Sequence, residues 1–334
     1  MNKKLRLSTA ALTLLSPFAA FADDPTGPTV WDGFSGWLSP DWSRDFSATL
    51  GVKVWLNEWS RDSFIKEGAL GQDVTDAGDV ITVGVIIDDT APDSQESDIE
   101  PVPIPQLSAR YKWLFVTGSY YSKTEFDFEP TFVRTRLVDA AGNPTNDLVR
   151  VTRVETSGDR YEWDASGGIY VHPYLAILGG YKKVRQTIDQ TIQSTNTTDV
   201  VFGTEPVRRS YSDIDIEGPT IGIATSVPIG RGFGVFATYA HGFMDANIRD
   251  VVTSPCCSDD GGQDFEFDAD YDVAEAGFSY THGMDQLMPH LPLSAATVYA
   301  GYRYQAISTD FEEQGSQDRS DVTRGFAVGV NLTF

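Results

Sequence analysis

The sequence predicts an all-β protein: a transmembrane antiparallel up-and-down β-barrel of about ten strands, with long extracellular loops and short periplasmic turns. Three observations lead to this fold class. Many segments alternate apolar residues with small or polar ones, as strands with one apolar face do. The connections between them alternate between tight turns and long polar stretches. The N-terminus has the features of an export signal, and no later segment offers the roughly 18 uninterrupted apolar residues of a spanning helix.

Residues 1–22 are predicted to be a signal peptide that is removed after Ala22. A positive region with Lys3, Lys4 and Arg6 precedes a short apolar stretch and a small-x-small cleavage site. Because this leader contains three basic and no acidic residues, cleavage changes the formal net charge from −23 to −26. Such acidity argues against nucleic acid as a partner and favours cations.

Ten later segments have the pattern of a strand with one apolar face. The clearest is the last, in which Phe326, Val328, Val330, Leu332 and Phe334 alternate with small or polar residues. One face of such a strand suits lipid and the other suits a crowded barrel interior. The expected strands cover residues 45–57, 104–112, 114–127, 158–171, 174–190, 210–227, 233–248, 265–281, 293–309 and 320–334.

The last strand resembles those of the Gram-negative outer-membrane β-barrel superfamily, in which the final strand alternates and ends on Phe. The resemblance implies that Phe334 is the signal read by the barrel assembly machinery, and that the mature protein resides in the bacterial outer membrane. The spacing of the other segments extends the resemblance over residues 45–334, the expected barrel domain. A secreted β-sandwich is the soluble alternative, but it would not explain the alternating connections.

The connections on one side of the expected barrel are tight turns at Lys112-Trp113, His172-Pro173 and Gly230-Arg231-Gly232. The long polar connections of the other side cover residues 58–103, 128–157, 191–209, 249–264 and 310–319. With both termini on the short-turn side the number of strands is even, as in bacterial barrels. Aromatic residues near the expected strand ends, among them Trp55 and Trp59, are predicted to lie in the interface girdles.

Three irregular stretches have more than one interpretation. Residues 23–44, rich in aromatic residues, form either a periplasmic or interfacial lead-in or a plug that enters the barrel. The segment Glu58–Glu100 carries twelve acidic residues, and its apolar run Val80–Ile87 forms either a small hairpin or an inward constriction. The connection 128–157 is predicted to continue two strands beyond the membrane as a hairpin.

An acidic stripe is the strongest charge feature. Glu266, Asp268, Asp270 and Asp272 alternate with apolar residues and therefore share one face of a strand. Charges that face lipid at depth are costly, so the stripe is expected to face the lumen or to stand above the membrane. The phase slips after these residues, so that Glu275 also faces inward, and a β-bulge would reconcile the two halves. The other predicted luminal residues are Arg110, Arg160, Glu162, Asp164 and Arg303.

The sequence contains no catalytic constellation that stands out, and no enzyme activity, cofactor or metal is expected. The omptin proteases are ten-stranded outer-membrane barrels that use paired aspartates and an Asp-x-His pair. Asp213 and Asp215 resemble the first pair, but no histidine here has an Asp two residues before it. The adjacent Cys256 and Cys257 form no disulfide framework, and the acidic loop that follows them matches no defined calcium loop.

Three functions follow, in order of preference. The first is a porin-like channel for small solutes with a preference for cations, because the predicted inner wall is polar and partly acidic. The second is a closed structural or adhesive barrel that acts through its extracellular loops, because ten strands leave little free interior. A surface enzyme of the omptin type is third. The expected partners are outer-membrane lipid and lipopolysaccharide, the assembly machinery, and small solutes or cations.

Overall fold

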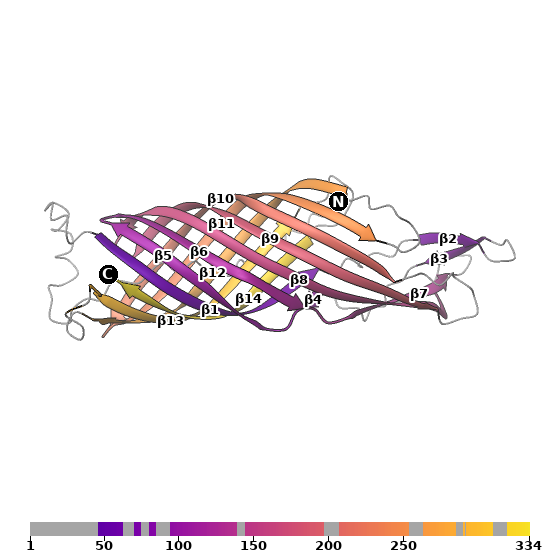
Figure 1. Ribbon diagram of the computed structural model, residues 1–334, viewed down its shortest axis with the longest axis horizontal. Helices are drawn as coiled ribbons and strands as arrows, with labels where there is room; N and C mark the ends of the chain where they lie inside the picture. Colours follow the sequence, from indigo (N-terminus) through magenta and orange to yellow (C-terminus); the bar gives the residue numbers. More distant parts are fainter. Residues whose placement is uncertain are drawn as a thin grey trace, which may run out of the picture.

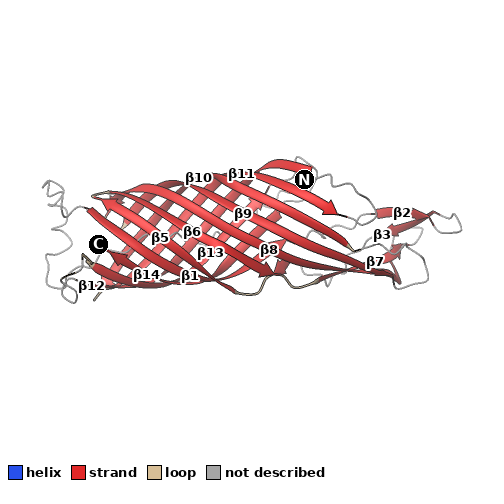
Figure 2. Cartoon of the chain, in the orientation of Figure 1, coloured by secondary structure: helices blue, strands red, loops and turns tan. Residues whose placement is uncertain are grey.

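The alternating segments form one closed antiparallel sheet in the computed structural model of the protein, with the strands tilted around a long axis (Figures 1 and 2). The structure describes residues 46–62, 70–74, 80–84, 94–138, 144–196, 207–253, 263–284, 290, 292–309 and 319–334. No helix in this described part is long and apolar enough to cross a membrane. The predicted signal peptide, the segment 23–44 and the cysteine pair lie outside the described residues.

Ten strands close the barrel, which confirms the predicted fold class. Each pairs with the next strand along the chain, except that β6 passes over β7 to β8, and β14 pairs with β1. The barrel strands are β1 (Phe46–Asp62), β5 (Glu100–Tyr111), β6 (Leu114–Asp127), β8 (Pro144–His172), β9 (Leu175–Asn196), β10 (Arg208–Gly230), β11 (Phe233–Thr253), β12 (Gln263–Gly283), β13 (Ala295–Thr309) and β14 (Arg319–Thr333).

Four short strands extend the sheet at the end opposite the C-terminus (Figure 1). β2 (Leu70–Val74) and β3 (Val80–Gly84) form a hairpin, and β3 pairs with β7 (Thr131–Val138). β7 pairs in turn with the upper part of β8, which confirms the hairpin predicted in the connection 128–157. β4 (Ser94–Glu96) pairs with the end of β1.

The tight turns lie at the end that carries the C-terminus. Lys112 and Arg231 adopt positive φ angles of 54° and 55°, and Gly230 and Gly232 flank the second of these residues with φ angles of 111° and 82°. Glycine adopts such angles without a steric penalty, so the Gly-Arg-Gly sequence suits a sharp reversal between β10 and β11. The turn between β8 and β9 is at residues 173–174, one residue later than predicted.

An apolar belt surrounds the half of the barrel next to these turns. On β1 the outward side chains from Phe46 to Leu56 are apolar and mostly exposed, over a stretch of 11 residues. A strand needs about 9–11 residues to cross a membrane. The belt continues through Val328 and Phe326 on β14 and Phe278 on β12. The lower half of the barrel therefore has the outer surface of a membrane-spanning segment.

Above the belt the polarity of the two faces inverts. On β10 the outward side chains change from Ile223 and Ile221 to Glu217, while Ile216 and Ile214 point inward and are buried. The reason is the solvent: outside the membrane the outer face meets water, so apolar side chains gain by packing in the interior. The strands β8 to β12 have 21 to 29 residues each, so a tall wall of the barrel stands beyond the belt.

The structure also corrects two predictions on β1. Trp55 and Trp59, expected in the interface girdle, point inward and are 0% exposed. Tyr120 and Tyr302, which were expected in the girdle as well, do point outward and are exposed. Both tryptophans alternate with outward residues of β1, and their neighbours in the interior include Tyr121, with ring centroids 6.0 Å from Trp55 in an edge-to-face arrangement.

Candidate functional site

A network of charged side chains crosses the interior of the barrel, and its first centre is Glu275 on β12. One of its carboxylate oxygens, Oε2, accepts hydrogen bonds from Lys53 Nζ on β1 at 2.6 Å and from the Arg303 guanidinium on β13 at 3.3 Å. None of the three side chains is more than 4% exposed. A buried charge is tolerated only where it is paired and hydrogen-bonded, and these two cations supply that pairing.

The second centre is Glu162 on β8. It accepts hydrogen bonds from Lys182 Nζ on β9 at 2.5 Å and from Arg160 Nε at 2.7 Å. Gln305 Nε2 on β13 donates to the same carboxylate at 2.5 Å. The Arg160 guanidinium also donates to the Thr323 hydroxyl on β14 at 2.8 Å. The Glu162 carboxylate thus links β8, β9 and β13, and Arg160 extends the network to β14.

A chain of hydrogen bonds joins the two centres across the barrel. Arg303 donates to Gln305 Oε1 at 3.3 Å, and Gln305 donates to Glu162. In the order of strands around the barrel, β8 and β13 are five positions apart in either direction, so they lie on opposite sides. The contact between Gln305 and Glu162 therefore spans the lumen rather than following the wall.

Aromatic rings pack against this network. The Arg303 guanidinium lies over the Trp55 ring, 4.9 Å from its centroid, and Arg160 lies 5.7 Å from the centroid of Trp59. Lys182 Nζ lies 5.0 Å from the centroid of the buried Tyr271 ring. Arginine and lysine are attracted to aromatic faces most strongly where water is excluded. Charged and aromatic side chains together fill the middle of the barrel.

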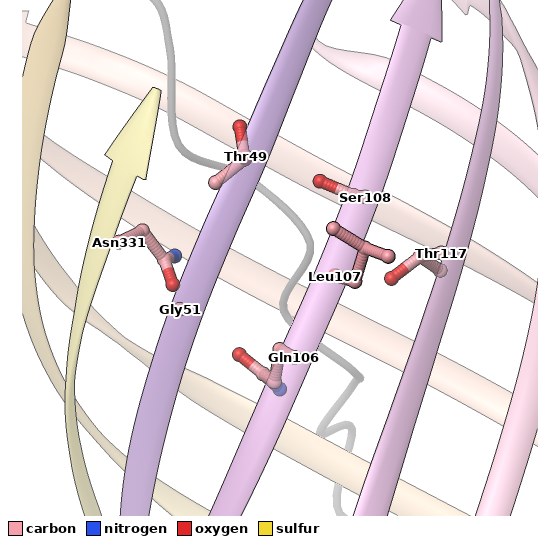
Figure 3. A pocket seen from close by; sticks show the side chains of 7 residues that line it. All are labelled: Thr49, Gly51, Gln106, Leu107, Ser108, Thr117 and Asn331. Atoms are coloured by element: carbon pink, nitrogen blue, oxygen red, sulfur yellow. The ribbon is translucent and has the colours of Figure 1, made fainter. Parts of the chain in front are cut away.

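Nearer the tight turns the interior holds a small cavity between β1, β5, β6 and β14 (Figure 3). Its volume is about 10 Å³, which is room for at most a single water. Its polar lining includes Thr49, Gln106, Ser108 and Asn331. Tyr299 on β13 donates to Gln106 Oε1 at 3.0 Å across the interior. This cavity is too small to pass a hydrated ion.

The structure places the predicted luminal residues in two groups. The register of β11, β12 and β13 is continuous, so the predicted bulge in β12 is absent. Alternation then turns the acidic stripe outward, because Tyr271 and Val273 fill the interior. Six predicted residues point inward: Arg110, Arg160, Glu162, Asp164, Glu275 and Arg303. Four point outward above the belt, which contradicts their assignment to the lumen and agrees with the alternative that the stripe stands above the membrane: Glu266, Asp268, Asp270 and Asp272.

Three members of the network were not predicted. Lys53 stands on the polar face of the first strand, opposite the lipid-facing residues, and this position was a usable signal. The residues on either side of Lys182 and Gln305 do not alternate regularly between apolar and polar, so the sequence does not show which face of the strand is inward there. Their partners come from strands far apart in the sequence, and only the closed barrel brings them together.

Ion pairs link neighbouring strands on the outer wall just above the belt, between β9 and β10 and between β14 and β1. Arg185 on β9 donates twice to Asp213 on β10, at 3.0 and 2.6 Å, and Lys183 donates to Glu217 at 2.9 Å. The hydrogen bonds to Asp213 raise the pKa of the Arg185 guanidinium. Arg324 on β14 donates to Glu58 at 3.3 Å. These pairs are partly exposed and contribute little stability.

Two of the outward-facing carboxylates, Asp270 and Asp272, contact His241, the one histidine of the upper wall among the described residues. His241 Nδ1 lies 3.0 Å from Asp272, and its Nε2 lies 3.6 Å from Asp270. The Asp213 and Asp215 pair faces outward and is occupied by the cations of β9. In the described part of the chain, no group of three or more His, Cys, Asp or Glu side chains could hold a metal ion.

No family model and no curated protein matches the sequence. Among solved structures, the outer-membrane protease OmpT from Escherichia coli is similar, with 12% identity and a TM-score of 0.50; 86% of this chain and 97% of that one are covered. The P. putida toluene transporter TodX has 10% identity and a TM-score of 0.28, with 90% and 91% covered. A Pseudomonas aeruginosa FadL homologue has 8% identity and a TM-score of 0.25, with 87% and 90% covered. The likeness to OmpT shows a shared fold, that of an outer-membrane β-barrel.

Proposed function

We propose that this protein is a closed structural or adhesive barrel of the outer membrane that acts through its extracellular part and does not conduct solutes along its axis. One observation carries the proposal: a hydrogen-bonded network of buried side chains spans the lumen from β8 to β13. An open porin needs a continuous path of water. Here the middle of the interior is filled by paired charges and aromatic rings.

The inner charges also argue against an acidic, cation-preferring pore wall. Both carboxylates of the network form ion pairs: Glu275 with Lys53 and Arg303, and Glu162 with Arg160 and Lys182. The acidic stripe that motivated cation preference faces outward. Each of the two carboxylates is paired with two cations, so neither offers uncompensated negative charge to a passing cation.

The tall wall supports a role at the cell surface. Strands β8 to β12 extend well beyond the length that a membrane requires. This upper part has an apolar interior and a charged exterior, like a soluble β-barrel. It therefore presents a rigid surface, to lipopolysaccharide, to a host surface or to another envelope protein.

Conductance in a planar bilayer tests the proposal. The refolded protein without its signal peptide should give no steady current steps, with insertion verified by the difference in gel mobility between heated and unheated samples. As a matched control, the same preparation of the Gln305→Gly/Arg303→Ser variant should conduct, because it removes the side chains that join the two centres. Steady, cation-selective steps from the unaltered protein would refute the closed barrel and restore the porin-like channel.

A further inference from the structure

In the described part of the barrel wall, the longest interruption of the main-chain ladders lies between β5 and β6. The ladder between β5 and β6 contains only the pairs from Gln106↔Ser119 to Tyr111↔Leu114, although both strands continue toward the extracellular side. Beyond this stretch the two segments pair again only at an isolated β-bridge between Ser97 and Phe128. All of residues 94–138 are described, so the gap in pairing is a feature of the wall itself.

Three prolines cause the gap. Pro101, Pro103 and Pro105 occupy every second position of β5, and their backbone groups face β6, since the Pro103 carbonyl accepts a hydrogen bond from Ser122 Oγ at 3.4 Å. Alternate residues of a strand direct their main-chain groups to alternate neighbours. Proline has no N–H, so β5 offers β6 no donor at these three positions. Its pairing with β1 stays complete.

The opposite strand adapts to the missing donors. β6 has a register shift against β8 between Tyr121 and Thr124, which marks a bulge at the same level. The Ser122 carbonyl, which faces a proline, accepts instead from Thr124 Oγ1 at 3.0 Å. We call the facing segments Pro101–Pro105 and Tyr120–Thr124 the proline seam. In lipid every main-chain polar group needs a partner, and side-chain hydroxyls supply some of them here.

Behind the proline seam lies an apolar layer of the interior. Val102 and Ile104, which alternate with the prolines, are 0% and 3% exposed, and Val102 pairs in register with Trp55. Trp55 and Tyr121 pack edge to face. The indole N–H groups of Trp55 and Trp59 are buried with no hydrogen-bond acceptor among the described residues. Buried donors without a partner are rare in proteins and need an explanation.

We propose that the proline seam is a lateral opening, through which the acyl chain of an outer-leaflet lipid reaches a site built by Val102, Ile104, Tyr121 and the two tryptophans. The seam lies at the outer end of the apolar belt, where the wall faces acyl chains and the headgroup region. Val102 and Ile104 match an acyl chain in polarity, and the ester carbonyl of such a lipid would accept from an unpaired indole N–H. The site shares Trp55 and Trp59 with the luminal network but opens through the wall between β5 and β6, so it goes beyond the proposed function.

The opening is tested with a matched pair of buried cysteines in a Cys256→Ser/Cys257→Ser background. Val102 and Ala327 both pair with Trp55, on opposite sides of β1, and both are 0% exposed. Ala327 lies in β14, whose ladders to both neighbours are continuous. In lipid vesicles, a membrane-soluble maleimide should modify Val102→Cys about 10- to 1,000-fold faster than Ala327→Cys, because three ladder bonds are missing beside the first. Equal rates would overturn the opening.

Restoring the donors gives a second test. The Pro101→Thr/Pro103→Thr/Pro105→Thr variant supplies the three N–H groups, and it should lower the modification of Val102→Cys to the rate of Ala327→Cys. Native mass spectrometry of protein extracted from the outer membrane should find a retained acyl lipid, which is lost in the proline variant and in Trp55→Leu. Absence of lipid from the unaltered protein, or equal retention by all three proteins, would overturn the acyl-chain site. A silent bilayer does not bear on these results, so the two proposals fail separately.

Discussion

Replacing Glu162 with Gln tests how much of the stability of the barrel rests on the luminal network. Glu162 is 2% exposed, and its carboxylate is the acceptor for Arg160, Lys182 and Gln305. Glutamine has nearly the same shape, so the substitution leaves no cavity. It does remove the negative charge between two buried cations. Removing one partner of a buried ion pair costs about 3–5 kcal/mol, because the other charge remains buried without compensation.

The expected loss in the free energy of unfolding is therefore about 3–5 kcal/mol for Glu162→Gln. Reversible urea unfolding in lipid vesicles measures it, followed by tryptophan fluorescence and by gel mobility. The control is Asp213→Asn, which breaks the pair with Arg185 on the outer wall, where the arginine side chain is 41% exposed. An exposed pair contributes about 0–1 kcal/mol, so this variant should unfold close to the unaltered protein.

A loss below about 1 kcal/mol for Glu162→Gln would refute the stabilising role of the luminal network, since the network would then contribute no more than an exposed ion pair. A second variant separates charge from packing. Lys182→Met added to Glu162→Gln removes one of the two uncompensated cations and replaces it with an apolar chain of similar length. The double variant should recover part of the lost stability.

Three further outcomes are expected. Phe334→Ser should reduce the amount of assembled protein in the outer membrane, measured by heat-dependent gel mobility, and normal insertion would contradict the assembly role of the terminal residue. Gly158→Val should cost about 1–3 kcal/mol of stability by overpacking, because a Cβ at Gly158 would lie 2.9 Å from the Trp59 ring; an unchanged urea midpoint would show that the ring can move. In intact cells and in the Cys256→Ser/Cys257→Ser background, Asp268→Cys should react with a membrane-impermeant maleimide and Glu275→Cys should not, since the first side chain faces outward and the second is buried. Equal labelling would contradict the assigned faces of β12.

The sequence determined the fold and the lower half of the barrel. In the terminal strand, Phe326, Val328 and Val330 alternate with small residues, and the structure turns all three outward. The alternation is reliable there because lipid outside and a packed polar interior impose opposite demands on the two faces. The same demands identified Arg160, Glu162 and Arg303 as inward residues, all of which lie within membrane strands or at their upper ends.

Only the tertiary structure decided which way the upper half of each strand faces. The acidic stripe was assigned inward on the premise that apolar residues face lipid. Asp268 and Asp270 stand above the belt, where water is outside and apolar Ala269 and Tyr271 fill the interior. Alternation with a period of two indicates that the two faces of a strand meet different surroundings, but it does not indicate which face meets lipid, water or the barrel interior. The height at which the membrane ends is a property of the assembled barrel.

The luminal network also depended on the tertiary structure. Its members come from six strands, and the contact between Gln305 and Glu162 joins residues that are 143 positions apart in the sequence. The alternation of apolar and polar residues predicted that Glu162 and Glu275 would be inside, but it left open whether they line water or pair with cations. Closure of ten strands decided this, because a barrel of that diameter brings side chains from opposite walls into contact, as Gln305 and Glu162 show.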